Sequence, residues 1–172
     1  DFNSLRPRAI GLTGILVTHG HWDHIRAIKE LDRLTGAVTS AGAADAAAIK
    51  EQEDYTVEEE LTGGESFDFY RSDTVIRSLH VPGHTPGSIV YTLETTWEDG
   101  TPATLLFTGD ALFPGGVGKT DSPQQFGELF SNVLEKLFGG FDDDAIVLPG
   151  HGRSTTLGDE RPHLEEWGTR GW

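Results

Sequence analysis

The most constraining feature of this sequence is the heptapeptide THGHWDH at residues 18–24. Its pattern, His-x-His-x-Asp-His, places four metal-binding side chains within six residues. Residues two apart in an extended backbone point to the same side, so His19 and His21 can bind one ion. Asp23 and His24 lie beyond the point where the chain must turn, so they can face a second ion. A polar turn with unrelated histidines is the alternative, but it leaves the close spacing of these side chains unexplained.

A second pattern recurs along the chain. A short apolar run, expected to form a strand, leads into a glycine-containing turn that carries a single His or Asp. This happens at residues 15–17, 74–81, 104–107 and 145–148, which precede His19, His84, Asp110 and His151 respectively. Strand ends are rigid and their loops can line a cleft, so distant residues can converge there. One loop histidine alone is more often a surface residue, but four such loops beside the heptapeptide predict a shared site.

The remaining periodicity indicates a mixed α/β domain with strands and helices interspersed. Further strands are expected at 37–40, 66–70 and 88–93, and helices at 25–34, 43–51, 124–138 and 160–167. Gly36 is a plausible stop for the first helix, and Asp23 is a candidate N-cap for it, a role that does not exclude ligation. Residues 53–60 read as a solvated acidic connector, and residues 114–121 as a flexible loop.

Charge and composition restrict the partners. The net charge is −15, with 28 acidic against 13 basic residues, so binding to nucleic acid or to an anionic membrane surface is disfavoured. The sequence contains no cysteine, which leaves His, Asp and Glu as the strong metal ligands. We therefore expect a small-molecule substrate. The sequence leaves open whether the chain forms a homo-oligomer.

The sequence also contains no methionine. We therefore expect that Asp1 is not the natural start and that an N-terminal segment is missing. A targeting signal would lie in that segment, and the location expected from the remaining sequence is cytoplasmic.

Four motifs together resemble the metallo-β-lactamase-fold superfamily. They are THGHWDH (18–24), PGHTPGS (82–88), FTGDALF (107–113) and LPGHG (148–152). Trp22 and the GDALF segment make the sequence most similar to the hydroxyacylglutathione hydrolase (glyoxalase II) branch. The resemblance implies an αββα four-layer sandwich, formed by residues 1–172 as one domain. Family members have several strands ahead of the His-x-His motif, so we expect this domain to be N-terminally incomplete.

The resemblance also implies a site for two divalent ions, most simply zinc, with iron or manganese also possible. The first ion would be held by His19, His21 and His84, the second by Asp23, His24 and His151, with Asp110 bridging both. A hydroxide shared by the two ions would attack the carbonyl of a small thioester or ester, and Asp23 would help to orient it. Thr18, Thr85 and Ser88 are candidate hydrogen-bond partners of the ligands. Lys119 resembles a residue that faces the substrate, although a solvated lysine is the alternative.

Other functions remain open on the same motifs. One is an iron-dependent persulfide dioxygenase that uses a single iron. Others are a lactonase or β-lactamase-type hydrolase and a degenerate binding module that keeps only the fold, because fold does not determine substrate. The two remaining histidines, His80 and His163, are not expected to bind metal.

Overall fold

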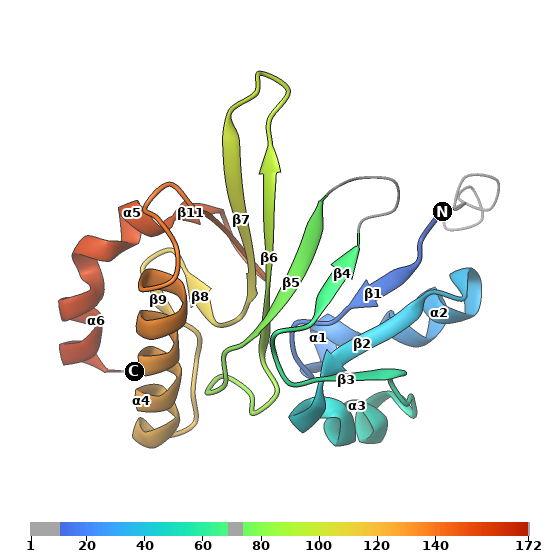
Figure 1. Ribbon diagram of the computed structural model, residues 1–172. Coiled ribbons are helices and arrows are strands. Elements are labelled where there is room, and N and C mark those ends of the chain that lie inside the picture. Colours follow the sequence, from blue (N-terminus) through green and yellow to red (C-terminus); the bar gives the residue numbers. More distant parts are fainter. Residues whose placement is uncertain (1–10, 69–73, 172) are drawn as a thin grey trace.

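Two β-sheets form the centre of the molecule in the computed structural model, which describes residues 11–68 and 74–171 (Figure 1). The smaller sheet is parallel, in the order β1 (Gly14–Leu16), β2 (Val38–Gly42), β3 (Glu59–Leu61). The larger sheet has the order β11 (Thr155–Thr156), β10 (Ile146–Pro149), β7 (Pro102–Gly109), β6 (Ile89–Thr96), β5 (Val75–His80), β4 (Ser66–Asp68). A short hairpin, β8 (Leu112–Phe113) and β9 (Gly116–Val117), follows β7.

Helices cover the outer faces of both sheets (Figure 1). On the smaller sheet lie α1 (Trp22–Ile25), α2 (Ile28–Thr35), the 3₁₀ turn η2 (Ala43–Asp45) and α3 (Ala46–Glu53). On the larger sheet lie α4 (Pro123–Asn132), its π-helical continuation η3 (Val133–Phe138), α5 (Leu157–Glu160), the 3₁₀ turn η4 (Arg161–His163) and α6 (Leu164–Arg170). The predicted αββα sandwich is confirmed.

Three clusters of buried apolar side chains fill the three spaces between these four layers. The largest joins the outer helices to the larger sheet and includes Leu129, Trp167 and Leu106. A second joins α1, α2 and α3 to the smaller sheet. The third lies between the two sheets and centres on Leu61, Ile89 and Tyr91. Each sheet is therefore anchored on its helices as well as on the other sheet.

The sheets are also linked by hydrogen bonds at the end of β1. The Tyr91 hydroxyl donates to the Val17 carbonyl at 2.8 Å, and the Ile89 amide donates to the Thr18 carbonyl at 2.8 Å. Strand β10 is parallel to β7, so both strands end at the same rim. The loop between β5 and β6 also lies at this rim, in the lower part of Figure 1. The fold therefore brings the ends of β1, β7 and β10 together with the β5–β6 loop.

The helix predicted over residues 25–34 begins earlier than expected and is split in two. Its first turn starts at Trp22, with His21 as the extended residue before it, so Asp23 lies inside the helix and is not its N-cap. A second helix, α2, begins at Ile28. The predicted stop is confirmed, because Gly36 has φ +65° and its amide donates to the Asp32 carbonyl at 2.7 Å.

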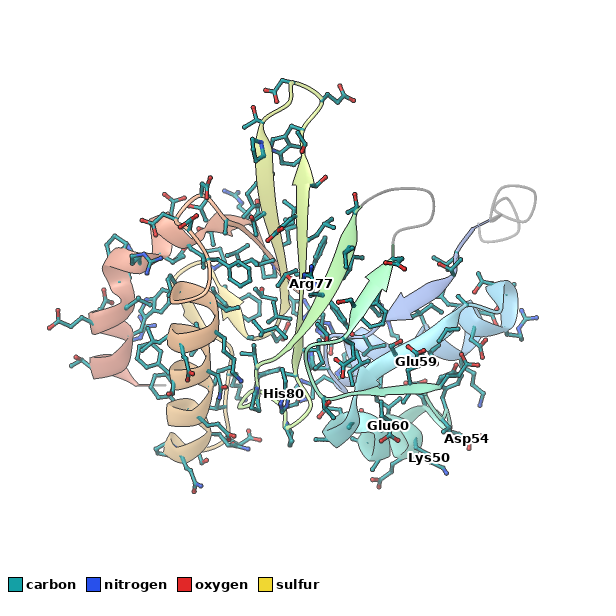
Figure 2. All side chains as sticks on the ribbon, in the orientation of Figure 1. Lys50, Asp54, Glu59, Glu60, Arg77 and His80 are labelled. Atoms are coloured by element: carbon teal, nitrogen blue, oxygen red, sulfur yellow. The ribbon has the colours of Figure 1, made fainter. Side chains whose placement is uncertain are left out.

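Two segments are more ordered than the sequence indicated. The acidic connector predicted at 53–60 runs into β3, where Glu59 and Glu60 are exposed on opposite sides of the strand (Figure 2). Backbone pairing with β2 places Glu59 and Glu60 in the sheet although both side chains stay exposed. The loop predicted at 114–121 contains β9, and it is held because Val117 packs into the largest cluster. Part of the strand predicted at 66–70 and most of the irregular segment before residue 15 lie outside the described residues.

Within those described ranges, each helix is too short or too polar to cross a lipid bilayer.

Candidate metal centre

All seven predicted ligands lie at the rim described above. The chain after β1 carries His19 and His21, and the first helical turn carries Asp23 and His24. The other three follow β5, β7 and β10: His84, Asp110 and His151. Their side chains form three overlapping groups, and within each group the ligand atoms lie within 4.8 Å of one another. The structure therefore brings together every residue of the predicted ligand set.

The first group consists of three imidazoles. Nδ1 of His21 lies 3.1 Å from Nε2 of His19 and 3.0 Å from Nε2 of His84. Three ring nitrogens thus point toward one place. His19 is buried, with 1% of its surface exposed, and forms the floor of the group.

The second group combines imidazoles with a carboxylate. Nε2 of His24 lies 3.0 Å from Nε2 of His151, and that same His151 atom lies 3.1 Å from Oδ2 of Asp23. Both Asp23 and His151 are exposed, so this group faces solvent more than the first. The open side of the centre therefore includes Asp23 and His151 together with His21, the exposed member of the first group.

Asp110 lies between these two groups and forms the third group with His19 and His24. Its Oδ1 is 3.4 Å from Nε2 of His24, and its Oδ2 is 3.7 Å from Nε2 of His84 and 3.8 Å from Nε2 of His151. Among the described residues, Oδ1 of Asp110 is the one buried side-chain oxygen or nitrogen that has no hydrogen-bond partner. A buried carboxylate oxygen without a partner is costly unless a cation satisfies it. The donor set therefore fits divalent ions on both sides of Asp110.

Burial and mutual repulsion favour the neutral forms of His19 and His24. Burial, reinforced by the neighbouring histidines, lowers the pKa of His19 to about 2. The pKa of His24 is lowered too, mainly by burial, against the opposing effect of Asp110. For Asp23, desolvation raises the pKa, but a hydrogen bond from its own backbone amide and the adjacent histidines lower it overall. Neutral imidazoles and an ionised carboxylate are the forms that bind metal.

Contacts behind the ligands set which ring nitrogen faces the centre. Nδ1 of His84 donates to the Lys119 carbonyl at 2.7 Å, which leaves Nε2 of His84 as the lone-pair nitrogen. Nδ1 of His19 lies 3.2 Å from the Thr18 hydroxyl, one of the predicted partners. The sequence suggested a role for the Lys119 side chain, which is exposed, but did not reveal the role of its carbonyl.

Glycines allow the loops to approach the ligands closely. A Cβ on Gly150 would lie 2.6 Å from Oδ1 of Asp110 and 2.6 Å from Cε1 of His24. A Cβ on Gly118 would lie 1.7 Å from the Asp110 carbonyl oxygen. Any side chain at these two positions would displace the Asp110 carboxylate or the loop that carries it.

Sequence reasoning missed one buried residue beside the centre. Asp45 is 3% exposed, and its carboxylate accepts hydrogen bonds from the backbone of both histidine loops. Its sequence signal is weak: a single acidic residue in the alanine-rich segment 41–49. Of the two remaining histidines, His80 lies at the end of β5 (Figure 2), with Nε2 2.8 Å from the Pro86 carbonyl oxygen, and His163 lies by Glu166.

Comparison with known proteins identifies the family. Residues 4–151 match the metallo-beta-lactamase superfamily, so the chain belongs to that family. A hydroxyacylglutathione hydrolase, GloC of Haemophilus influenzae, is 31% identical over 172 residues, covering 88% of this chain and 74% of that protein. The resemblance that the four motifs indicated is confirmed.

Solved structures share the fold. The ETHE1 protein of Myxococcus xanthus superposes with a TM-score of 0.68 at 29% identity, covering 88% of this chain and 61% of that chain. The protein TTHA1623, solved in a di-iron-bound form, superposes with a TM-score of 0.66 at 27% identity, covering 93% of this chain and 80% of that chain. The structure neighbours therefore agree with the family assignment.

Proposed function

We propose that this protein is a metal-dependent hydrolase that cleaves a small thioester or ester with two divalent ions. The observation that carries the proposal is the arrangement of six ligand side chains around Asp110, whose Oδ1 is buried without a hydrogen-bond partner. The kinship to a hydroxyacylglutathione hydrolase supports a thioester as the substrate class.

The grouping of the ligand atoms supports a division between two ions. His19, His21 and His84 would hold one ion, Asp23, His24 and His151 the other, and the two oxygens of Asp110 would serve both. Imidazole and carboxylate ligands suit zinc, iron and manganese. When bound, two such ions lower the pKa of a shared water from about 15.7 toward about 7 and polarise a carbonyl oxygen.

Asp23 and Asp110 have different tasks because their exposure differs. The side chain of Asp110 is 15% exposed and lies between the groups, so it holds the two halves of the site at a fixed separation. The side chain of Asp23 is 31% exposed at the open side, where its carboxylate can accept a hydrogen bond from the attacking water and orient it. Catalysis then needs no side-chain nucleophile.

Lys119 is the candidate substrate-binding residue. Its side chain is exposed, while its carbonyl accepts the hydrogen bond from His84, so the lysine is fixed beside the centre. On a chain of net charge −15, a local cation beside the metal ions would favour an anionic substrate group at this place. We infer that Lys119 binds a substrate carboxylate.

The test pairs elemental analysis with a substrate panel of thioesters, esters, lactones, β-lactams and persulfides. The purified protein should hold about two equivalents of zinc, iron or manganese and should hydrolyse a thioester. His21→Ala should abolish turnover, while His163→Ala, an exposed histidine on η4, is the matched control and should keep it. Full thioesterase activity in a verified metal-free preparation would refute the proposal.

A persulfide dioxygenase is the second candidate, and one observation favours it. His84 lies 3.7 Å from Asp110 and both adjoin the buried His19, so these three ligands could serve one iron without Asp23 and His151. The di-iron-bound neighbour shows iron in a related fold. Oxygen uptake by the iron-loaded protein with a persulfide separates the two reactions, and no uptake excludes the dioxygenase.

The same substrate panel distinguishes a hydrolase of another specificity and a binding module. Cleavage of lactones or β-lactams in preference to thioesters would indicate the former. No bound metal at micromolar supply would indicate a module that keeps only the fold.

A further inference from the structure

The buried carboxylate of Asp45 accepts hydrogen bonds from both loops that carry the first group of histidines. Its Oδ2 accepts from the Gly20 amide at 2.8 Å and from the Thr85 hydroxyl at 2.7 Å. Its Oδ1 accepts from the Gly87 amide at 2.8 Å. All three partners are donors, which matches a carboxylate, whose oxygens only accept.

This use of Asp45 is unusual for its position in the chain. Asp45 is the N-cap residue of α3, where an aspartate normally accepts a hydrogen bond from its own helix. Here it makes no side-chain capping bond, since the preceding 3₁₀ turn gives it helical dihedral angles. The carboxylate instead reaches across to the loops around residues 20 and 85–87.

Each donor lies in a loop that carries a first-group histidine. Gly20 separates His19 from His21, and Thr85 follows His84 directly. The carbonyl of Gly20 is held as well, by the side-chain amide of Gln52 on α3 at 2.9 Å. Within the described residues, none of the hydrogen bonds of Asp45 reaches Asp23, His24 or His151.

The fit between these loops and Asp45 is tight. A Cβ on Gly87 would lie 2.6 Å from Cγ of Asp45, and a Cβ on Gly20 would lie 3.2 Å from its Cβ. Thr85 is fixed further by Ser88, whose hydroxyl lies 2.7 Å from the Thr85 hydroxyl. The loops therefore have little room to move relative to the carboxylate while these contacts persist.

We propose that Asp45 is a positioning residue that sets the affinity of the first metal ion, and that it acts on this ion and not on the second. It does so by fixing the backbone of two loops, the one that carries His19 and His21 and the one that carries His84. The inference rests on the proposed two-ion centre. Loss of a residue that orients metal ligands typically weakens metal binding by about 10- to 100-fold.

The test measures Zn²⁺ affinity, by competition with a chromophoric chelator, in backgrounds that retain one intact group. His151→Ala keeps the first group, and His84→Ala keeps the second. Adding Asp45→Asn forces an amide nitrogen against at least one backbone N–H. It should weaken Zn²⁺ binding about 10- to 100-fold in the His151→Ala background and leave it within about twofold in the His84→Ala background.

Controls separate positioning from folding. Asp32→Asn, which removes a carboxylate that accepts from the Tyr55 hydroxyl, should leave both affinities unchanged. If Asp45→Asn does not fold by circular dichroism, Thr85→Val carries the test, with a loss of about 2- to 10-fold confined to the first group. Asp45→Asn should change the Co²⁺ absorption spectrum in the His151→Ala background and leave it unchanged in the His84→Ala background.

Two results would overturn the inference: an unchanged first-group affinity, or equal weakening of both groups. If the wild-type protein and both single-group variants bind no Zn²⁺ at all, the proposed two-ion centre and the role of Asp45 are both refuted. Two ions in the wild type with no selective effect of Asp45→Asn refute only the role of Asp45.

Discussion

Gly150→Ala is the substitution whose effect on the metal centre follows most directly from the geometry. Gly150 precedes His151 and its amide donates to the Gly109 carbonyl at 2.8 Å, so the backbone there is tied to the loop of Asp110. A methyl group added at Gly150 would lie 2.6 Å from Oδ1 of Asp110 and 2.6 Å from Cε1 of His24. The substitution therefore acts on two ligands without removing either.

The added methyl group forces a displacement larger than a metal site accepts. Ordinary contact with a Cβ begins at 3.4 Å, so each ligand or the loop must move by about 0.8 Å. Metal–ligand distances tolerate deviations of about 0.2 Å, so a shift of this size breaks the coordination geometry. A misplacement of about 1 Å typically costs about 100-fold in rate. We expect kcat/KM to fall about 100-fold. We also expect Zn²⁺ affinity to fall at the group formed by Asp23, His24 and His151.

Gly152→Ala is the matched control. Gly152 has φ +79° and no atom lies within 4 Å of the place that an added methyl group would take, so alanine there meets backbone strain but no ligand. That strain costs about 1–2 kcal/mol, which should lower Tm while metal content stays at the wild-type level. Metal analysis, thioester kinetics and thermal melts on both variants complete the assay. Wild-type metal affinity and turnover in Gly150→Ala would refute the steric argument.

Three further predictions concern stability. Desolvation raises the pKa of Glu65, but hydrogen bonds, led by that from Ser78, outweigh it and lower the pKa from 4.5 to about 2. The contribution of Glu65 to folding stability is therefore present above pH 4.5 and lost as the pH falls toward 2. Glu65→Gln should therefore flatten the drop in Tm over this pH range. Equal slopes of Tm against pH in the variant and the wild type would contradict this. Gly127→Ala, in α4 with no atom within 4 Å, should stabilise the protein by about 0.5–1 kcal/mol in urea unfolding, and destabilisation would contradict it. Leu129→Ala, fully buried in the largest cluster, should cost about 2–5 kcal/mol in the same assay, and a loss below about 1 kcal/mol would show that the cavity collapses.

The sequence predicted which seven residues meet at one rim better than it predicted the secondary structure around them. The candidate ligands have a spacing that can be read directly, and His19, Asp110 and His151 follow the apolar runs that form β1, β7 and β10. The four-layer arrangement came from the family resemblance, because periodicity alone indicates only mixed α/β. The ligand assignment to two particular ions stays a prediction.

The features that sequence reasoning did not predict depend on contacts between residues far apart in the chain. Strand β3 is carried by backbone pairing with β2, which the acidic side chains of Glu59 and Glu60 do not reveal. Strand β9 is ordered because Val117 packs into a cluster built from distant residues. Asp45 was missed because its three donors lie 25 to 42 residues away in the chain. No local pattern encodes such a contact.

The long hairpin of β6 and β7 has a practical consequence for handling the protein. Its eight-residue strands rise about 3.3 Å per residue, so the turn at Asp99–Gly100 lies about 25 Å from the rim that carries the ligands (Figure 1). The tip is exposed, and Glu98 lies on it without the positive φ of Gly100. A cysteine introduced there, in a chain that has none, would accept a single label or a surface tether. A protein immobilised at this point would present the rim that carries the candidate ligands to the solution.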